Sequence, residues 1–232
     1  SRLAQGLRTA HELLPCLLRP SPVALASRSA AMRLLSLIIY RWKEGEDPIE
    51  LCVNSDMSGF SFIQRRFVLE HIRFHSRFIV GRTALGRRSS IDFEQNLGKC
   101  HTWVHPAGIG AAVLVDREYP TRVAFSLLSE SVRIFLEAQA GVWENLDTDA
   151  AISCPQIKAM FQQYQDPSEA DKLTKIENDL EEVKGTVARS LDELLRRGES
   201  LEQLMRKSGD LSKAAIEFHR TAKQNNQCCK LY

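Results

Sequence analysis

The sequence predicts an α+β domain with a central antiparallel sheet, followed by a long coiled-coil helix. Two observations lead to this prediction. From Met32 to Tyr164 the hydrophobic pattern gives, in order, two strands, a helix, three strands, a helix and a short helix. From Leu173 onward, apolar residues recur in alternating steps of three and four, which is the 3.5-residue period of a coiled coil. The 232 residues suffice for one domain of moderate size plus an extended segment.

The first half of the domain is predicted to hold two strands and a helix. Residues 33–40 form a short apolar run, and residues 49–53 alternate as a second strand after a turn. Ser61 is in position to cap a helix that runs from about residue 62 to residue 80. One face of this helix carries Ile63, Phe67, Phe74 and Phe78.

The second half begins with a basic loop, residues 81–90. We interpret it as a solvated connector, because it lacks the G-x-x-x-x-G-K pattern of a phosphate-binding loop. Contact of this loop with anionic lipid headgroups is the alternative. Residues 100–105 and 109–115 are predicted strands, Pro120 opens a helix with a broad apolar face, and residues 155–164 form a short amphipathic piece.

The coiled-coil face extends over sixteen positions, twelve of them apolar. The positions are Leu173, Ile176, Leu180, Val183, Val187, Ser190, Leu194, Arg197, Leu201, Leu204, Ser208, Leu211, Ala215, Phe218, Ala222 and Asn225. A buried core helix rarely continues such a rhythm for fifteen steps, so partner helices are expected. Gly185, Gly198 and Gly209 each cost about 1 kcal/mol relative to alanine in a helix. The segment is therefore expected to become ordered when it meets its partners.

One position of this face carries a cation, Arg197. A guanidinium in a helical core is costly unless its donors meet acceptors on the partner strands. A single polar core residue is also the best-attested way to fix the register of a bundle. The alternative is an arginine that extends to solvent, as Arg196 can. We favour the core position, because the rhythm continues unbroken on both sides of Arg197.

The chain ends in the residues Q-C-C-K-L-Y, with Cys229 fourth from the end. This spacing is a C-a-a-X prenylation pattern with a second cysteine, Cys228, beside it. One lipid chain holds a protein on a membrane only marginally, whereas two hold it stably. We therefore predict a prenyl group on Cys229 and a second lipid on Cys228. Tyr232 departs from the usual final residues, and as an aromatic it leans toward geranylgeranyl.

These C-terminal features together resemble an R-SNARE. Residues 171–222 resemble the R-SNARE motif, and Arg197 matches the central-layer arginine of that family. The Cys228-Cys229 terminus resembles the lipid-anchored, synaptobrevin-like longin branch, which has no transmembrane helix. By this resemblance the lipid on Cys228 is a palmitoyl or a second prenyl group.

Three local matches extend the resemblance back to Met32. Residues 61–65 resemble the start of the first helix of a longin domain. Residues 118–125 resemble its junction between fifth strand and second helix, and residues 164–171 its linker to the SNARE motif. The resemblance implies a profilin-like longin domain with a five-stranded antiparallel sheet flanked by helices, followed by a long SNARE helix.

The function that the resemblance implies is that of an R-SNARE in vesicle docking and membrane fusion. The partners would be three Q-SNARE helices in a four-helix bundle, in which Arg197 meets central glutamines. The protein would cycle between a closed cytosolic state and an open, lipid-anchored state on Golgi, ER–Golgi, endosomal or vacuolar membranes. No cofactor, nucleic acid or enzymatic activity is implied. The alternative is a lipidated coiled-coil tether or trafficking regulator that does not drive fusion.

An apolar groove is the second feature that the resemblance implies. In the family it borders the first long helix and holds the folded-back SNARE segment or the protein's own prenyl chain. Phe74 matches a groove residue, with Phe67 and Phe78 on the same helix. Plain core packing is an equally weighted alternative for Phe74.

These predictions divide the chain into five parts. The parts are an N-terminal extension (1–31), the longin domain (32–164), a linker (165–170), the R-SNARE motif (171–227) and the lipidation motif (228–232). The extension is Arg-rich with a single acid, which is typical of a mitochondrial transit peptide. We favour instead a disordered or non-native extension, because the patterned region begins at Met32.

Composition argues against other classes of protein. The net charge is +2, and residues 171–227 hold eleven basic and eleven acidic residues, unlike a nucleic-acid arm. No apolar run is long enough to span a bilayer, and no C-x-x-C occurs, which predicts a reduced, cytosolic protein. His71 with His75, and His101 with His105 beside Cys100, could supply zinc ligands, but neither spacing is a zinc motif. We therefore predict no metal site.

Overall fold

The computed structural model describes residues 33–93, 98–168, 170 and 187–228. Its elements are β1 (Leu34–Arg41), β2 (Ile49–Ser55), α3 (Phe62–Arg82), β3 (Arg88–Phe93), β4 (Gly98–His105), β5 (Ile109–Val115), α4 (Thr121–Ala138), α5 (Pro155–Gln163), β6 (Val187–Arg189), η3 (Leu191–Leu194), α7 (Leu201–Lys207) and α8 (Lys213–Cys228).

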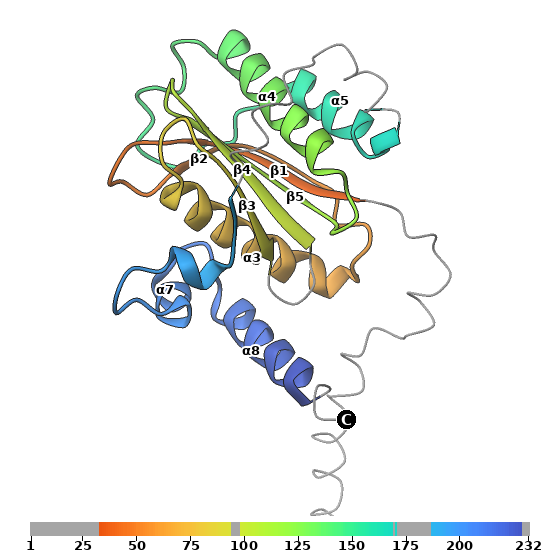
Figure 1. The fold of residues 1–232 in the computed structure, drawn as a ribbon, viewed down its shortest axis with the longest axis vertical. Coiled ribbons are helices and arrows are strands. Elements are labelled where there is room, and N and C mark those ends of the chain that lie inside the picture. The colour runs from red at the N-terminus through yellow and green to blue at the C-terminus, as the bar shows by residue number, and fades with distance from the viewer. Residues whose placement is uncertain (1–32, 94–97, 169, 171–186, 229–232) are drawn as a thin grey trace, which may run out of the picture. The chain divides into compact units, whose positions relative to one another are not determined.

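The sheet has the order β2-β1-β5-β4-β3-β6 (Figure 1). The first five strands pair antiparallel. The sixth, β6, adds to the edge of β3 in the parallel direction, with Ser89 opposite Val187 and Ile91 opposite Arg189. The predicted five-stranded antiparallel sheet with flanking helices is confirmed, and a segment from beyond the domain extends it by one strand.

Two apolar layers lie on opposite faces of the sheet. In β1, Leu37 and Ile39 belong to the cluster that includes α4 and α5, whereas Ile38 and Tyr40 belong to the cluster that includes α3. This division follows from the alternation of side chains along a strand. Figure 1 shows α4 and α5 on one side of the sheet and α3 on the other.

Helix α3 begins and packs as its sequence requires. Ser61 is the N-cap, and its backbone N–H donates to Gln64 Oε1 at 3.2 Å, as in a capping box. At the other end, Gly110 of β5 lets α3 approach the sheet closely, since a Cβ there would collide with the side chain of Val80. Inside the layer, the hydroxyl of Tyr40 lies 2.7 Å from Ser76 Oγ, so a buried polar pair is satisfied.

The sequence pattern placed the other helices of the domain correctly. Pro120 is the N-cap of α4, and α5 begins at Pro155, as predicted. The basic loop predicted at residues 81–90 is wrong at both ends. Gly81 and Arg82 still belong to α3, and residues 88–90 begin β3, the strand whose position the pattern did not locate.

The long C-terminal helix is interrupted in this structure. Residues 187–228 form β6, η3, α7 and α8 instead of one continuous helix. The breaks contain Gly198, which has a φ of 85°, and Gly209. Both glycines were expected to weaken the helix, and apolar residues between the breaks, Leu201 and Met205, are buried in the cluster that includes α3.

Candidate functional site

The C-terminal segment folds back onto α3. Both α8 and η3 contact α3, β6 and η3 contact β3, and α7 contacts α8. Figure 1 shows α7 and α8 on the same side of the sheet as α3. We call the part of α3 covered in this way, from Phe67 to Arg82, the docking face.

The apolar part of the docking face is one continuous cluster. It joins Ile72, Phe74 and Ile79 of α3 to buried residues of the C-terminal segment, which are Leu191, Leu194, Leu201, Met205, Leu211 and Ala215. Leu204 and Ile216 pack against the cluster and are half-buried. Four of the predicted coiled-coil positions are therefore buried here, namely Leu194, Leu201, Leu211 and Ala215.

The three predicted groove residues all lie in or against this cluster. Phe74 is 6% exposed, and its ring stacks at 6.5 Å from that of Phe78. Phe67 is half-buried and stacks on Phe218 of α8, with ring centroids 5.5 Å apart. In this structure the C-terminal segment, a candidate occupant of the groove, contacts Phe67 through Phe218 and shares the apolar cluster with Phe74 and Phe78.

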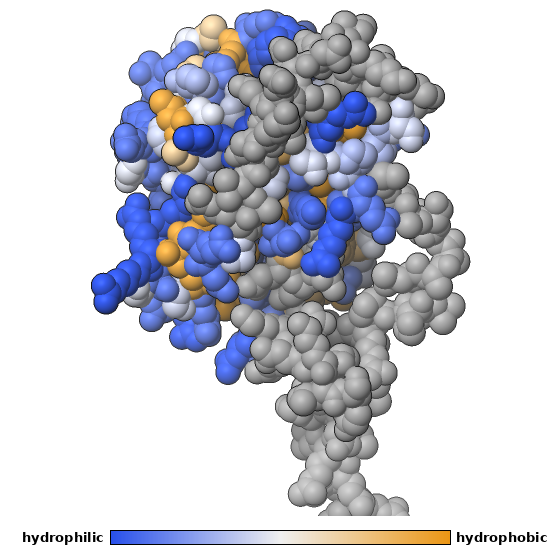
Figure 2. Space-filling model, viewed as in Figure 1, coloured by the Kyte–Doolittle hydropathy of each residue, from blue (hydrophilic) through white to orange (hydrophobic). Residues whose placement is uncertain are grey.

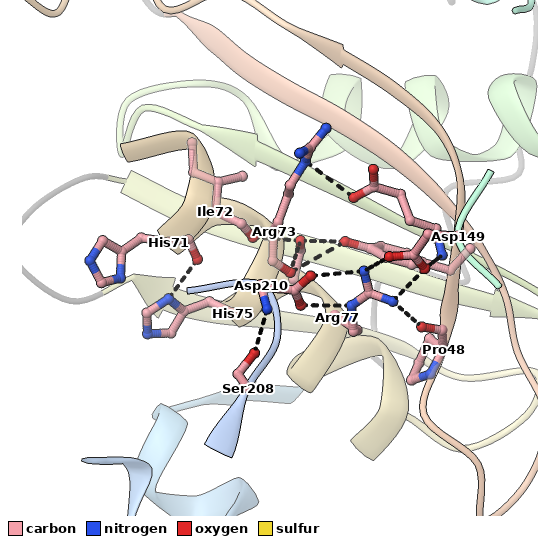
Figure 3. Close-up of polar contacts among 12 residues, drawn as sticks. Pro48, His71, Ile72, Arg73, His75, Arg77, Asp149, Ser208 and Asp210 are labelled. Carbon is pink, nitrogen blue, oxygen red and sulfur yellow. Dashed lines mark hydrogen bonds and ion pairs between the residues drawn. The ribbon is translucent and has the colours of Figure 1, made fainter. Parts of the chain in front are cut away.

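Arg77 is the centre of the polar contacts (Figure 3). It reaches Asp210, between α7 and α8, through Nε at 2.8 Å and Nη2 at 3.0 Å. The same guanidinium donates to both carboxylate oxygens of Asp149, at 2.8 and 2.7 Å, and to the carbonyl of Pro48 at 2.6 Å. Bidentate charge-assisted pairs of this kind are strong and geometrically specific. Arg77 therefore ties the C-terminal segment to two parts of the domain.

Two further polar contacts flank Arg77. Arg82 Nη2 donates to both carboxylate oxygens of Glu199 at 2.9 Å. Glu70 Oε2 accepts from the backbone N–H of Ser212 at 2.9 Å and from its hydroxyl at 2.7 Å. The Ser212 oxygen in turn accepts from the N–H of Ala215 at 3.2 Å, so Ser212 caps α8 while it binds α3.

A histidine of α3, His71, also contacts α8. His71 Nε2 lies 2.9 Å from the carbonyl oxygen of Ala215, and the rings of His71 and His219 are 5.1 Å apart. The N-terminal part of α3 thus contacts later residues of α8, and its middle contacts earlier ones. The two helices are therefore antiparallel.

The contacts shift the ionisation of the acidic groups toward the charged form. Hydrogen bonds from Arg77 lower the pKa of Asp149. Burial would raise the pKa of Glu70, but the bonds from Ser212 and Arg66 lower it overall. The pKa of Glu199 is lowered by the backbone N–H of Arg196 and by Arg82. The contacts Glu70–Ser212 and Arg82–Glu199, which join the domain to the C-terminal segment, are therefore made by ionised carboxylates, as is the Arg77–Asp149 pair within the domain.

Comparisons with known proteins agree with the sequence resemblance. The Synaptobrevin family model matches residues 172–231. VAMP-like protein YKT61 of Arabidopsis thaliana is 34% identical over 201 residues, which cover 86% of this chain and all of the relative. Synaptobrevin homolog YKT6 of Saccharomyces cerevisiae is 32% identical over 200 residues, which cover 85% of this chain and 98% of the relative. The chain belongs to the longin-type R-SNARE family.

Family membership establishes the general activity. This R-SNARE functions in vesicle trafficking, and it acts through SNARE-complex partners. The family is non-enzymatic and typically has no cofactor. No helix in the described part of the chain is long and apolar enough to cross a membrane.

Arg197 of this R-SNARE lies outside the buried cluster. It is exposed in the turn between η3 and α7, where Gly198 follows it in a left-handed conformation. Ser190 is also exposed, and Ser208 is half-buried. The docked segment thus buries Leu194, Leu201 and Leu211 and leaves Arg197 in solvent.

For several predicted residues, the structure describes no side-chain position. Leu173, Ile176, Leu180, Val183 and Cys229 lie outside the described residues. For three others, Val187 in β6 and Ala222 and Cys228 in α8, the structure describes the backbone but not the side chain. Their predicted roles remain predictions.

Sequence reasoning missed the polar side of the docking face. Arg77 and Asp210 are separated by 133 positions, and nothing in their spacing relates them. Likewise, nothing in their spacing relates Glu70 to Ser212 or Arg82 to Glu199. The one available signal was Ser212, a capping residue three positions before Ala215, which indicates a helix start inside the motif.

The histidines considered for zinc have other surroundings. His101 is fully buried in β4, where Nδ1 lies 2.6 Å from Ser90 Oγ, and burial lowers its pKa to about 4. His75 Nδ1 lies 2.8 Å from the carbonyl oxygen of His71. Among the residues that the structure describes, no group of three or more His, Cys, Asp or Glu is arranged to hold a metal ion.

Proposed function

We propose that this R-SNARE alternates between a docked, closed state and an open state in which residues 171–227 form one helix of a four-helix bundle. Three Q-SNARE helices would supply the rest of the bundle. The supporting observation is that Leu194, Leu201, Leu211 and Ala215 are already buried against α3. The same apolar side chains cannot face α3 and a bundle core at once. Docking and assembly therefore compete.

Arg197 has a different part in this proposal. It is exposed when the segment is docked, so no buried cation has to be compensated in the closed state. On assembly it would enter the central layer and donate to the amide oxygens of three glutamines. The burial of successive apolar layers would then supply the free energy that draws two membranes together.

Membrane attachment completes the proposal. Cys229 would carry a prenyl group and Cys228 a palmitoyl or second prenyl group, because one lipid holds a protein only marginally. Only two residues separate the last predicted layer, Asn225, from Cys228. Such a short connection would transmit the force of helix formation to the lipid anchor. The membranes concerned would be those of Golgi, ER–Golgi, endosomal or vacuolar vesicles, on their cytosolic face.

The competition is tested by the rate of bundle formation. The full chain and a fragment of residues 171–227 are mixed separately with the same Q-SNARE helices, and complex formation is followed by circular dichroism. The fragment should assemble faster, because no docked state has to open first. Equal rates would contradict the closed state. Mass spectrometry of the C-terminal peptide from cells, with Cys228→Ser and Cys229→Ser as controls, tests the two lipids.

A further inference from the structure

The first turn of α3 carries an exposed apolar pair. Phe62 is 87% exposed and its neighbour Ile63 is 74% exposed. They are the most exposed large hydrophobic residues in the described part of the chain; Leu85 and Val142, the next two, are 49% and 53% exposed. The coloured surface visible in Figure 2 is largely hydrophilic, with hydrophobic residues in separate patches. An adjacent pair so exposed indicates an interaction surface.

Cationic side chains share this turn. Arg65 lies three positions after Phe62, and Arg66 lies three positions after Ile63, so each arginine is on the same side of the helix as an apolar residue. Both arginines are exposed. Arg65 Nε donates to the carbonyl of Phe60 at 3.1 Å, and its charge helps to lower the pKa of Asp56. Arg66 pairs with Glu70 at 2.9 Å and is 78% exposed.

The direction of α8 relates this turn to the end of the chain. Because Phe67 stacks on Phe218 and the helices are antiparallel, the later residues of α8 extend toward the start of α3. Helix α8 continues ten residues beyond Phe218, about 15 Å, whereas Phe62 lies five residues before Phe67, about 7.5 Å. The residues of α8 beyond Phe218 therefore run in the direction of the first turn of α3.

We propose that Phe62, Ile63, Arg65 and Arg66 form a membrane-contact surface for bilayers that contain anionic lipids. The two apolar side chains would enter the boundary between headgroups and acyl chains, and the two guanidinium groups would bind lipid phosphates. The surface lies outside the docking face, so it is available whether or not the C-terminal segment is docked. It would add a second attachment to the proposed lipid anchor, and in this respect it rests on the proposed function.

Vesicle flotation of the full chain without lipid modification tests this surface directly. Vesicles of phosphatidylcholine with 30% phosphatidylserine should bind the chain, and binding should fall with rising salt. The double substitution Phe62→Ser/Ile63→Ser should lower the partition coefficient at least about tenfold. The matched double substitution Leu85→Ser/Val142→Ser removes exposed apolar residues elsewhere and should change it less than twofold. Circular dichroism checks that each variant is folded.

The outcomes separate the possible occupants of this surface. Binding of Phe62→Ser/Ile63→Ser at the level of the unsubstituted chain, or no vesicle binding by either, would overturn the proposal. So would a lipidated Phe62→Ser/Ile63→Ser chain that moves from cytosol to membranes, because the surface would then cover the protein's own lipid. Arg65→Ala/Arg66→Ala should reduce binding to anionic vesicles only. None of these assays requires Q-SNARE helices, so failure here is distinct from failure of the proposed function.

Discussion

Replacement of Asp210 by alanine should weaken docking without touching a coiled-coil position. Asp210 is the residue through which the C-terminal segment reaches Arg77, by two bonds of 2.8 and 3.0 Å. Its side chain is 15% exposed and that of Arg77 is 17% exposed, so water screens the pair only in part. Asp210→Ala leaves Arg77 with Asp149 and Pro48, and the domain keeps its own contacts.

The size of the effect follows from these partners. A hydrogen bond to a charged group contributes about 1.5–3 kcal/mol, and breaking a buried ion pair costs more when a charge is left alone. Because Arg77 retains a carboxylate, we expect the lower end of the range, about 2 kcal/mol. That loss changes the ratio of docked to undocked chains about 30-fold.

Hydrogen exchange of the amides of α8 measures this ratio. Their protection factors in Asp210→Ala should fall about 30-fold, and the amides of β4 and β5 should keep theirs. Glu217→Ala is the matched control, because Glu217 lies on α8 with a side chain that is 69% exposed. Its substitution should change protection less than twofold. Unchanged protection of the α8 amides in Asp210→Ala would refute the claim that the Arg77–Asp210 pair holds the C-terminal segment on α3.

Three further substitutions test other parts of the structure. Ser212→Ala removes the cap of α8 and the hydroxyl bond to Glu70, so α8 protection should fall about fivefold, from a loss of about 1 kcal/mol, while Ser212→Thr should retain most of it. Burial lowers the pKa of His101 to about 4, whereas an unfolded histidine titrates near 6.5, so the unfolded chain gains a proton first as the pH falls. The free energy of unfolding measured in urea should therefore fall by about 3 kcal/mol between pH 6.5 and 4, and His101→Gln should lack this loss. Phe74→Glu places a charge in the shared apolar cluster and should move protein from cytosol to membranes in cell fractionation; an unchanged distribution, or an equal shift with Leu85→Glu, would argue against the docking face.

Much of the fold was accessible from local signals. Helix α4 has Pro120 at its start and a broad apolar face, and α5 begins at Pro155. Neighbouring residues alone therefore indicate where both helices begin. The strand β3 was expected from the order of elements but was not located, because Arg88-Ser89-Ser90 shows no strand alternation on its own. Its place is set by pairing with β4 and β6, which local sequence does not report.

The candidate site was accessible only in its apolar half. The spacing that marks Leu194, Leu201 and Leu211 as bundle layers also suits them to a groove on α3, since burial is not specific to a partner. The pair Arg77–Asp210 depends on a fold that brings together residues 133 positions apart. The sequence could therefore indicate what the segment buries but not how the docked arrangement is held.

The central claim is that Arg197 belongs to the core of a SNARE bundle, although it is exposed when the segment is docked. The most direct test mixes the full chain with Q-SNARE helices and measures the melting of an SDS-resistant complex for Arg197→Ala and for Arg196→Ala. The account predicts a stable complex that melts at a lower temperature with Arg197→Ala and is unaffected by Arg196→Ala. Equal melting temperatures for the two variants would show that Arg197 does not lie in the core of the bundle. The absence of a complex with every Q-SNARE set would contradict fusion and leave a lipidated tether.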